Sequence, residues 1–354
     1  MKRFRTYYRY FLIAVLCLFT VQSVSAQEQG NSVDVKEIIL GHMADAYEWH
    51  ITTWGDTHVT IPLLVIVKSE TTGWHAFSSA KLSDGKVYEN FYIDNERNGK
   101  IYEKQADGTT VRPLDISITK DVVQIWIVVV LMLTIFLSCA RWYKKRSVES
   151  EAPKGFVGLM EMFVMSIVDD IIKPSIGEAH YRPYTPYLLT AFFFIFITNL
   201  MGLVPFFPGG ANVTGNIMIT FFLAVCTFIA INLFGSKAYW KDIFWPDVPA
   251  FLKVPIPLMP VIEFFGIFTK PFALMVRLFA NMVGGHATIL ALTCVIFITC
   301  QLGVAIGSSL SFVSFLLMIF MNALELLVAY IQAYVFTMLS AVFIGLAHPA
   351  TEEK

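Results

Sequence analysis

This chain has few cysteines and no nucleotide-binding motif, and each absence excludes a class of site. Only five of its 354 residues are cysteine, and none lies between residues 27 and 120, so this polar region cannot form an internal disulfide. There is no CxxC pair and no Cys/His spacing of a zinc site. The lack of a P-loop argues against nucleotide binding, and a formal net charge of −1 gives no sign of a nucleic-acid partner. We therefore expect no cofactor and no metal.

Hydrophobic residues, in contrast, make up 56% of the sequence and include 31 phenylalanines, with a mean hydropathy of +0.62. This composition is typical of a membrane protein that crosses the bilayer several times. The expected fold is an all-α polytopic membrane protein with about five membrane-crossing helices, one interfacial helix and a small extracytoplasmic α/β domain. The expected membrane domain spans 121–354, with helices at about 121–140, 155–172 (interfacial), 187–205, 213–234, 257–302 and 306–346.

The first 26 residues have the pattern of a secretory signal peptide. Basic residues precede an apolar run to about Val21, and Val24-Ser25-Ala26 provides the small residue before a cleavage site. An uncleaved membrane anchor is the alternative. The signal peptide predicts that the region after it lies outside the cytoplasmic membrane.

Residues 27–120 read as a small soluble domain. Period-two stretches at 58–67 and 86–93 predict strands, and the dipeptides Asp84-Gly85, Asn98-Gly99 and Asp107-Gly108 predict hairpin turns. A short helix is expected before them, from about Val33 to Trp49. A group of polar residues at the junction invites a metal interpretation, but its spacing fits no standard site and an exposed polar surface explains it as well: His42, Asp45, Glu48, His50 and His58.

Basic residues set the expected orientation. Arg141 and Lys144–Arg146 follow the first span, Lys173 and Arg182 follow the interfacial segment, and the loop FPGGAN contains no basic residue. By the positive-inside rule, the N-terminal domain is periplasmic and the C-terminus cytoplasmic, in a multi-pass protein of the cell inner membrane.

The last two apolar stretches, 257–302 and 306–346, are twice as long as a perpendicular span. A helix of 40 residues is roughly 60 Å long, whereas the hydrocarbon core is about 30 Å thick. We therefore expect a strongly tilted or kinked helical hairpin, with Gly303 and Gly307 marking its turn.

Arg277 is the most unusual residue of this hairpin. An arginine at the centre of a membrane helix costs roughly 2.5–3.5 kcal/mol, so it normally faces the bundle interior or a water-filled cavity. Asn281 and Gly284 lie one and two turns further on the same helical face. Snorkelling of the arginine to an interface is the alternative interpretation.

Reflection about residue 305 predicts which residues face each other across the hairpin. Arg277 is then opposite Gln332, and His286 is opposite Glu325, with Asn322 one turn from Glu325. Arginine keeps its proton, whereas histidine and glutamate can both gain and lose one. This arrangement favours a proton relay through His286 and Glu325 that ends at a fixed charge. A structural ion pair remains the alternative for these two residues.

Polar amides in the preceding helices add candidates for the same path. Asn199, Asn212, Asn216 and Asn232 lie in or beside apolar helices, where an amide needs a partner or water. Each of them fits a simple tie between helices equally well.

The stretch KPFALMVRLFANM, from Lys270 to Met282, and YIQAYVF around Gln332 resemble the a subunit of F-type ATP synthases, as does TNLMGLVPF at Thr198–Phe206. The resemblance covers about residues 155–348. Many relatives carry glutamate and histidine in the opposite order at positions 286 and 325, and an acidic residue at the position of Gly202. Since the exchange keeps one acid and one imidazole, it suggests that the two residues act as a unit.

The resemblance implies a non-catalytic stator subunit that provides two offset proton half-channels beside a ring of c subunits. It implies that Arg277 attends the ring carboxylate and that Gln332, His286 and Glu325 belong to the proton path. The predicted path is completed by Asn281, Asn322, Asn199 and Asn216. Implied partners are the c ring, the b-subunit peripheral stalk, the F1 sector indirectly and the lipid bilayer. A His/Glu relay favours H⁺ as the ion.

Two other functions compete with this interpretation. A secondary transporter would use Arg277 to bind an anionic substrate at the midplane, and it predicts inverted repeats and broken helices that the sequence does not contain. A purely structural membrane subunit would not need a titratable pair near a buried charge.

Overall fold

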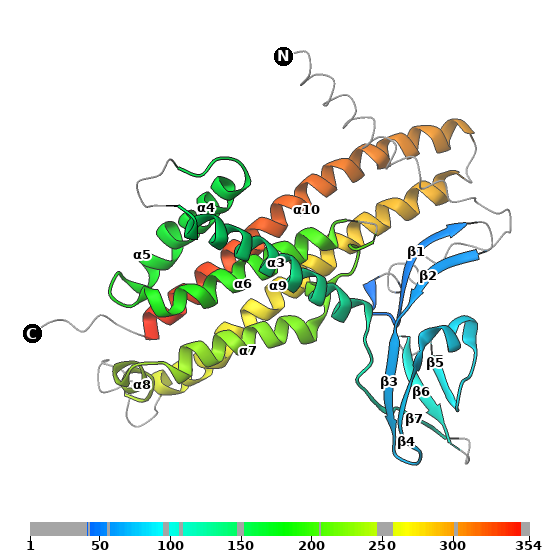
Figure 1. Ribbon diagram of the computed structural model, residues 1–354, viewed down its shortest axis with the longest axis horizontal. Coiled ribbons are helices and arrows are strands. Elements are labelled where there is room, and N and C mark those ends of the chain that lie inside the picture. Colours follow the sequence, from blue (N-terminus) through cyan, green and yellow to red (C-terminus); the bar gives the residue numbers. More distant parts are fainter. Residues whose placement is uncertain are drawn as a thin grey trace, which may run out of the picture.

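The fold is described from a computed structural model. The structure describes residues 41, 43–54, 57–94, 99–105, 109–146, 152–204, 207–245, 258–300 and 304–347. A small β domain adjoins one end of a helical domain (Figure 1). The predicted signal peptide lies outside the described residues.

The β domain consists of a two-stranded sheet and two three-stranded sheets, in the strand orders β1-β2, β4-β3-β8 and β5-β6-β7. Val65 and Val67 alternate with outward-facing neighbours on β3 and are fully buried with Phe77, Phe91 and Ile101. The strands are β1 Glu48–Trp54, β2 Thr57–Pro62, β3 Leu64–Ser69, β4 Gly73–Ser78, β5 Phe91–Asp94, β6 Lys100–Lys104, β7 Thr110–Val111 and β8 Leu114–Asp115.

The strand predictions are only partly confirmed. The strand expected at 58–67 is divided at Leu63, and the one expected at 86–93 begins only at Phe91, because Glu89 and Asn90 adopt positive φ angles. The predicted end of the first helix, at Trp49, is wrong, since strand β1 already starts at Glu48. The described part of this domain is therefore β-rich rather than α/β.

Four helices of the described chain are long and apolar enough to cross a membrane, namely α3, α6, α9 and α10, and α7 is apolar but shorter. The expected five spans correspond to these four and α7. The helices are α3 Lys120–Lys144, α4 Phe156–Ser166, α5 Lys173–Ile176, α6 Tyr181–Gly202, α7 Ile217–Leu233, α8 Lys237–Phe244, α9 Leu258–Cys300 and α10 Val304–Ala347.

Helix α6 forms the centre of the helical domain. Its side chains Leu188, Phe192 and Ile195 are fully buried, and the helix packs against α3 and α10. The segment expected to be an interfacial helix, 155–172, is helical, but a π-helical turn at Ile167–Ile172 inserts buried isoleucines into the same core. Only its first half, α4, has no buried residue.

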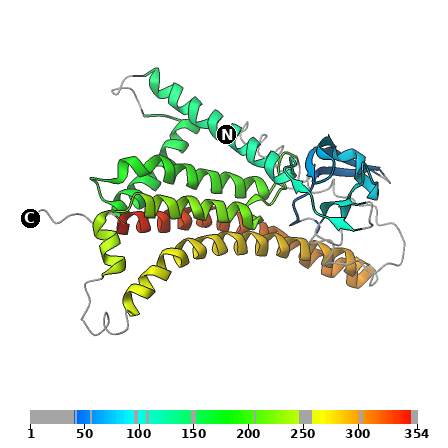
Figure 2. The ribbon, with the colours of Figure 1, turned by 90° about the horizontal axis from the view of Figure 1, so that it is seen from below.

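The C-terminal hairpin consists of two continuous helices of 43 and 44 residues. At 1.5 Å per residue each is roughly 65 Å long, and α9, which contains Pro271, follows a gentle arc rather than a sharp kink (Figure 2). Gly307 lies inside α10, so the prediction that it marks the turn is wrong, and Gly303 lies outside the described residues.

The β domain is joined to the membrane domain at the start of α3. The N–H groups of Lys120 and Asp121 donate to the Ala46 carbonyl (2.9 Å) and to Asp45 Oδ1 (3.2 Å). Because the first N–H groups of a helix have no intrahelical acceptor, the β domain caps this membrane helix from 76 residues away.

Tyr47 strengthens this junction. Its hydroxyl donates to Asp115, and burial followed by this hydrogen bond raises the pKa of Tyr47 above its usual range, so the phenol stays a donor. The ring of Trp49 meets Phe207 edge-on at a centroid distance of 5.3 Å. The described contacts therefore hold the β domain against both α3 and the segment before α7.

Replacing Asp45 with alanine tests this capping. Asp45→Ala removes the acceptor of the Asp121 N–H and should weaken the junction by about 1 kcal/mol, the typical value of a helix N-cap. Hydrogen exchange of the assembled complex should be faster at residues 43–54 and at the start of α3. Asp45→Asn keeps an acceptor and should exchange like the original protein. Equal rates for Asp45→Ala and Asp45→Asn would contradict the capping role.

Candidate functional site

The central feature of the hairpin is an ion pair between its two helices. His286 Nδ1 of α9 lies 2.7 Å from Glu325 Oε1 of α10, and the two side chains are 17% and 4% exposed. The predicted pairing of these residues is therefore confirmed. It brings an imidazole and a carboxylate together inside helices that are otherwise almost entirely apolar.

The pair has no other described hydrogen-bond partner. His286 Nδ1 and both carboxylate oxygens of Glu325 are buried, and none of them makes a well-angled hydrogen bond with a described residue. The 2.7 Å between Nδ1 and Oε1 is nevertheless short enough for an ion pair. Buried polar atoms that lack such a bond from the protein are suited to bind internal water. The arrangement therefore favours water that reaches the pair.

Two glycines border the pair from opposite sides. A Cβ on Gly285 would lie 2.8 Å from Glu325 Oε1, whereas a Cβ on Gly202 of α6 would lie 3.6 Å from His286 Nε2. Because Gly285 has no side chain, the Glu325 side chain can occupy that space. Because Gly202 has none, the backbone of α6 can lie close to the imidazole.

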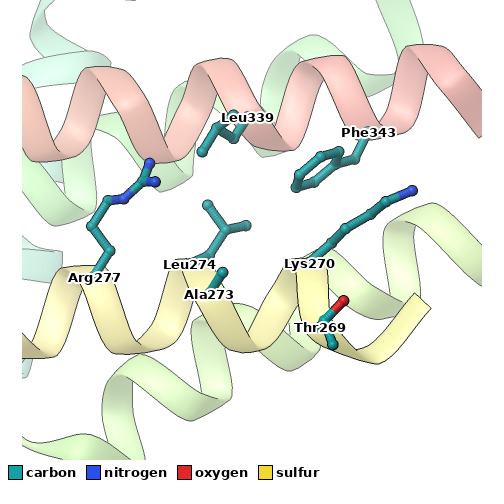
Figure 3. Close-up of a pocket in the computed structure, with 7 residues that line it drawn as sticks. All are labelled: Thr269, Lys270, Ala273, Leu274, Arg277, Leu339 and Phe343. Atoms are coloured by element: carbon teal, nitrogen blue, oxygen red, sulfur yellow. The ribbon is translucent and has the colours of Figure 1, made fainter. Parts of the chain in front are cut away.

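Arg277 lies nine residues before His286 on α9 and is exposed. Within the described part of the chain its guanidinium makes no hydrogen bond and no ion pair. It lines a cavity of about 380 Å³ together with Thr269, Lys270, Ala273, Leu274, Leu339 and Phe343. Figure 3 shows Arg277 and Lys270 projecting from α9 toward Leu339 and Phe343 on α10.

Among the described residues no hydrogen bond joins Arg277 to Gln332, which is buried. Arg277 instead lines the same cavity as Leu339 of the antiparallel helix. This fits the tendency of helical side chains to point back toward the N-terminus of their helix. The cavity that it enters contains two cations and no acidic side chain.

The predicted asparagines divide into two groups. Asn281 is exposed one turn after Arg277, and Asn322 donates to the Met318 carbonyl of its own helix (2.9 Å). Asn199 is fully buried and accepts a 2.6 Å hydrogen bond from Thr214 Oγ1. Asn216 caps α7 by accepting from the Met218 N–H (3.1 Å).

Three polar residues were not predicted as part of the site. Asp121 accepts from Asn216 Nδ2 (3.0 Å), Gln124 binds both backbone groups of Ala211, and Lys270 lines the cavity beside Arg277. Asp121 and Gln124 follow Lys120 in the first two turns of an otherwise apolar span, and this pattern could have marked them. No group of three or more potential metal ligands converges among the described residues.

Comparison with known proteins shows which family the chain belongs to. The family model described as ATP synthase A chain matches residues 122–345, which include all of α3 to α10 except their outermost residues. The chain belongs to this family.

Relatives support the assignment over most of their length. "ATP synthase subunit a" of Chlorobium phaeobacteroides is 43% identical over 71% of this chain and 72% of its own, and that of Pelodictyon phaeoclathratiforme is 44% identical over 79% and 80%. As a subunit a chain with four span-capable helices, the protein is a multi-pass, non-catalytic membrane subunit of an ATP synthase complex. A separate model for a domain of unknown function matches residues 38–117, the β domain.

The two glycines beside the pair provide a matched test. Gly285→Ala places a methyl group 2.8 Å from Glu325 Oε1 and should displace the carboxylate from His286, at a cost of about 1–3 kcal/mol for overpacking. ATP-driven acidification of inverted membrane vesicles should fall several-fold. Gly202→Ala meets only ordinary contact distances and should have a clearly smaller effect. The reverse order of the two effects would contradict the geometry of the site.

Proposed function

We propose that this chain is the stator subunit that provides two offset proton half-channels to and from the carboxylates of a c-subunit ring, and so couples proton flow to rotation and ATP synthesis. The observation that carries the proposal is Arg277, a permanent cation on an exposed face of a membrane-spanning helix with no described partner in its own chain. Such a charge needs an anion from outside the subunit, because a lone cation in a membrane is unfavourable.

The face around Arg277 is suited to a close neighbour. Ala273, Ala280 and Gly284 are exposed beside it, and small residues let a second helix approach closely. A ring carboxylate that faces lipid is neutral and becomes ionised beside a cation. Arg277 would supply that cation and, because it never releases its proton, would block direct proton flow between the half-channels.

The remaining residues take places on either side of this barrier. His286 and Glu325 form the proton-exchanging part of the outer half-channel, with Asn199 and Asn216 leading toward it. The cavity beside Lys270 supports an inner half-channel, with Gln332, Asn281 and Asn322 providing amides near the barrier.

Location and partners follow the same proposal. By the positive-inside rule, the basic residues Arg141, Lys144, Lys237 and Lys241 support a cytoplasmic location for their helix ends. The β domain would then be periplasmic and the C-terminus cytoplasmic. In the cell inner membrane the subunit would contact the c ring and the b-subunit peripheral stalk, and F1 only indirectly.

Arg277→Ala is the direct test of the proposal. ATP-driven acidification of inverted vesicles should be abolished, while immunoblots show the subunit and its partners assembled at normal levels. Arg277→Lys should also fail or nearly fail, because an ammonium group can lose its proton and lacks the planar fork of the guanidinium. Arg141→Ala, an exposed arginine at the end of α3, is the matched control and should pump normally. Normal pumping by Arg277→Ala would exclude this mechanism.

A further inference from the structure

A chain of polar side chains leads from the β domain to the His286–Glu325 pair. It begins at Asp45, which binds the backbone of Asp121 (3.2 Å), and the Asp121 carboxylate accepts from Asn216 Nδ2 (3.0 Å). Two residues earlier, Thr214 donates to Asn199 (2.6 Å). Asn199 lies one turn before Gly202 on α6, the residue that faces His286 Nε2.

Most of this chain is buried and only partly satisfied. Asp121 is 4% exposed, Thr214 1% and Asn199 0%. The Nδ2 groups of Asn199 and of nearby Asn212 have no hydrogen-bond partner among the described residues. Buried polar atoms without protein partners are the usual sites of internal water. A series of such atoms between the partly exposed Asp45 and the buried His286–Glu325 pair indicates a hydrated path.

We propose that Asp121 is the outermost proton-binding group of the outer half-channel, and that the β domain forms one wall of its entrance through Asp45. This inference rests on the proposed function above. It also gives a role to residues 38–117, which match a domain of unknown function separate from the ATP synthase A chain match.

The charges around Asp121 are compatible with collecting protons. Asp45 contributes a second carboxylate, and Lys100 and Lys120 are the cations close enough to offset part of this charge. Asn216 faces the same carboxylate from α7. Two carboxylates close together raise the local concentration of cations, protons included. The competing role for Asp121 is a tie between α3 and α7 that does not exchange protons.

The test is passive proton conductance of the membrane sector in inverted vesicles stripped of F1, driven by a potassium diffusion potential. The lumen of these vesicles is the outer side, so its pH is varied while the external pH stays fixed. The variants are Asp121→Asn, Asp121→His, Glu325→Gln and Glu103→Gln. Glu103 is the matched control, a buried carboxylate of the same β domain that is bound to Ser69 (2.8 Å) and lies off the path.

Asp121→Asn should lower conductance about tenfold at neutral lumenal pH. This is less than the roughly 10²–10⁴-fold effect of a group that transfers a proton in a transition state, because water can still deliver protons at an entrance. The loss should shrink as the lumen is acidified, because abundant protons bypass the missing group, and Glu103→Gln should conduct normally. Conductance equal to that of Glu103→Gln, or a loss of the same size at every lumenal pH, would overturn the role of Asp121, since a structural tie would not respond to lumenal protons.

Asp121→His decides the case if the asparagine variant does not assemble. It should shift the lumenal pH of half-maximal conductance and leave the dependence on external pH unchanged, and the absence of a shift would overturn the proposal. Glu325→Gln distinguishes a failure of this inference from a failure of the proposed proton-translocating function. Loss of conductance in Glu325→Gln with normal conductance in Asp121→Asn would refute only the entrance, whereas normal conductance in Glu325→Gln would refute the relay itself.

Discussion

The structure depends on the cost of keeping an imidazole and a carboxylate together inside apolar helices. Neither His286 nor Glu325 finds a neutral hydrogen-bond donor among the described residues, so each relies on the other and on protons or water. This requirement explains why Gly285 has no side chain where Glu325 lies, and why Gly202 brings α6 close to the imidazole.

The hairpin separates two kinds of charge. The His286–Glu325 pair is largely buried, whereas Arg277 is exposed, permanently charged and without a described partner in the chain. His286 of the pair faces Gly202 of α6, and the arginine faces a cavity shared with Lys270. At the opposite end of the polar path, the β domain caps α3 and brings Asp45 beside Asp121. The β domain, which lies outside the predicted membrane domain, thus contacts the start of α3.

The sequence predicted the pairing of His286 with Glu325 because both helices are long and regular, so reflection across one turn holds over many residues. Reflection did not predict the cavity that Arg277 lines with Leu339, since it ignores that a long side chain leans toward the N-terminus of its own helix. Local patterns predicted the apolar helices but not every strand of the β domain. There, positive φ angles at Glu89 and Asn90 move the start of β5 to Phe91. The Asp45–Asp121 contact joins residues 76 positions apart, and no local pattern encodes it.

The central claim is that His286 and Glu325 act as one proton-exchanging unit, and exchanging the two residues tests it most directly. His286→Glu alone leaves two carboxylates in contact and Glu325→His alone leaves two imidazoles, so each should lower ATP-driven acidification of inverted vesicles by at least about tenfold. The double exchange restores one acid and one base, and the account predicts that it recovers much of the lost pumping, a strong coupling in a double-mutant cycle. Pumping by the assembled double variant that is no better than that of the weaker single variant would contradict the account.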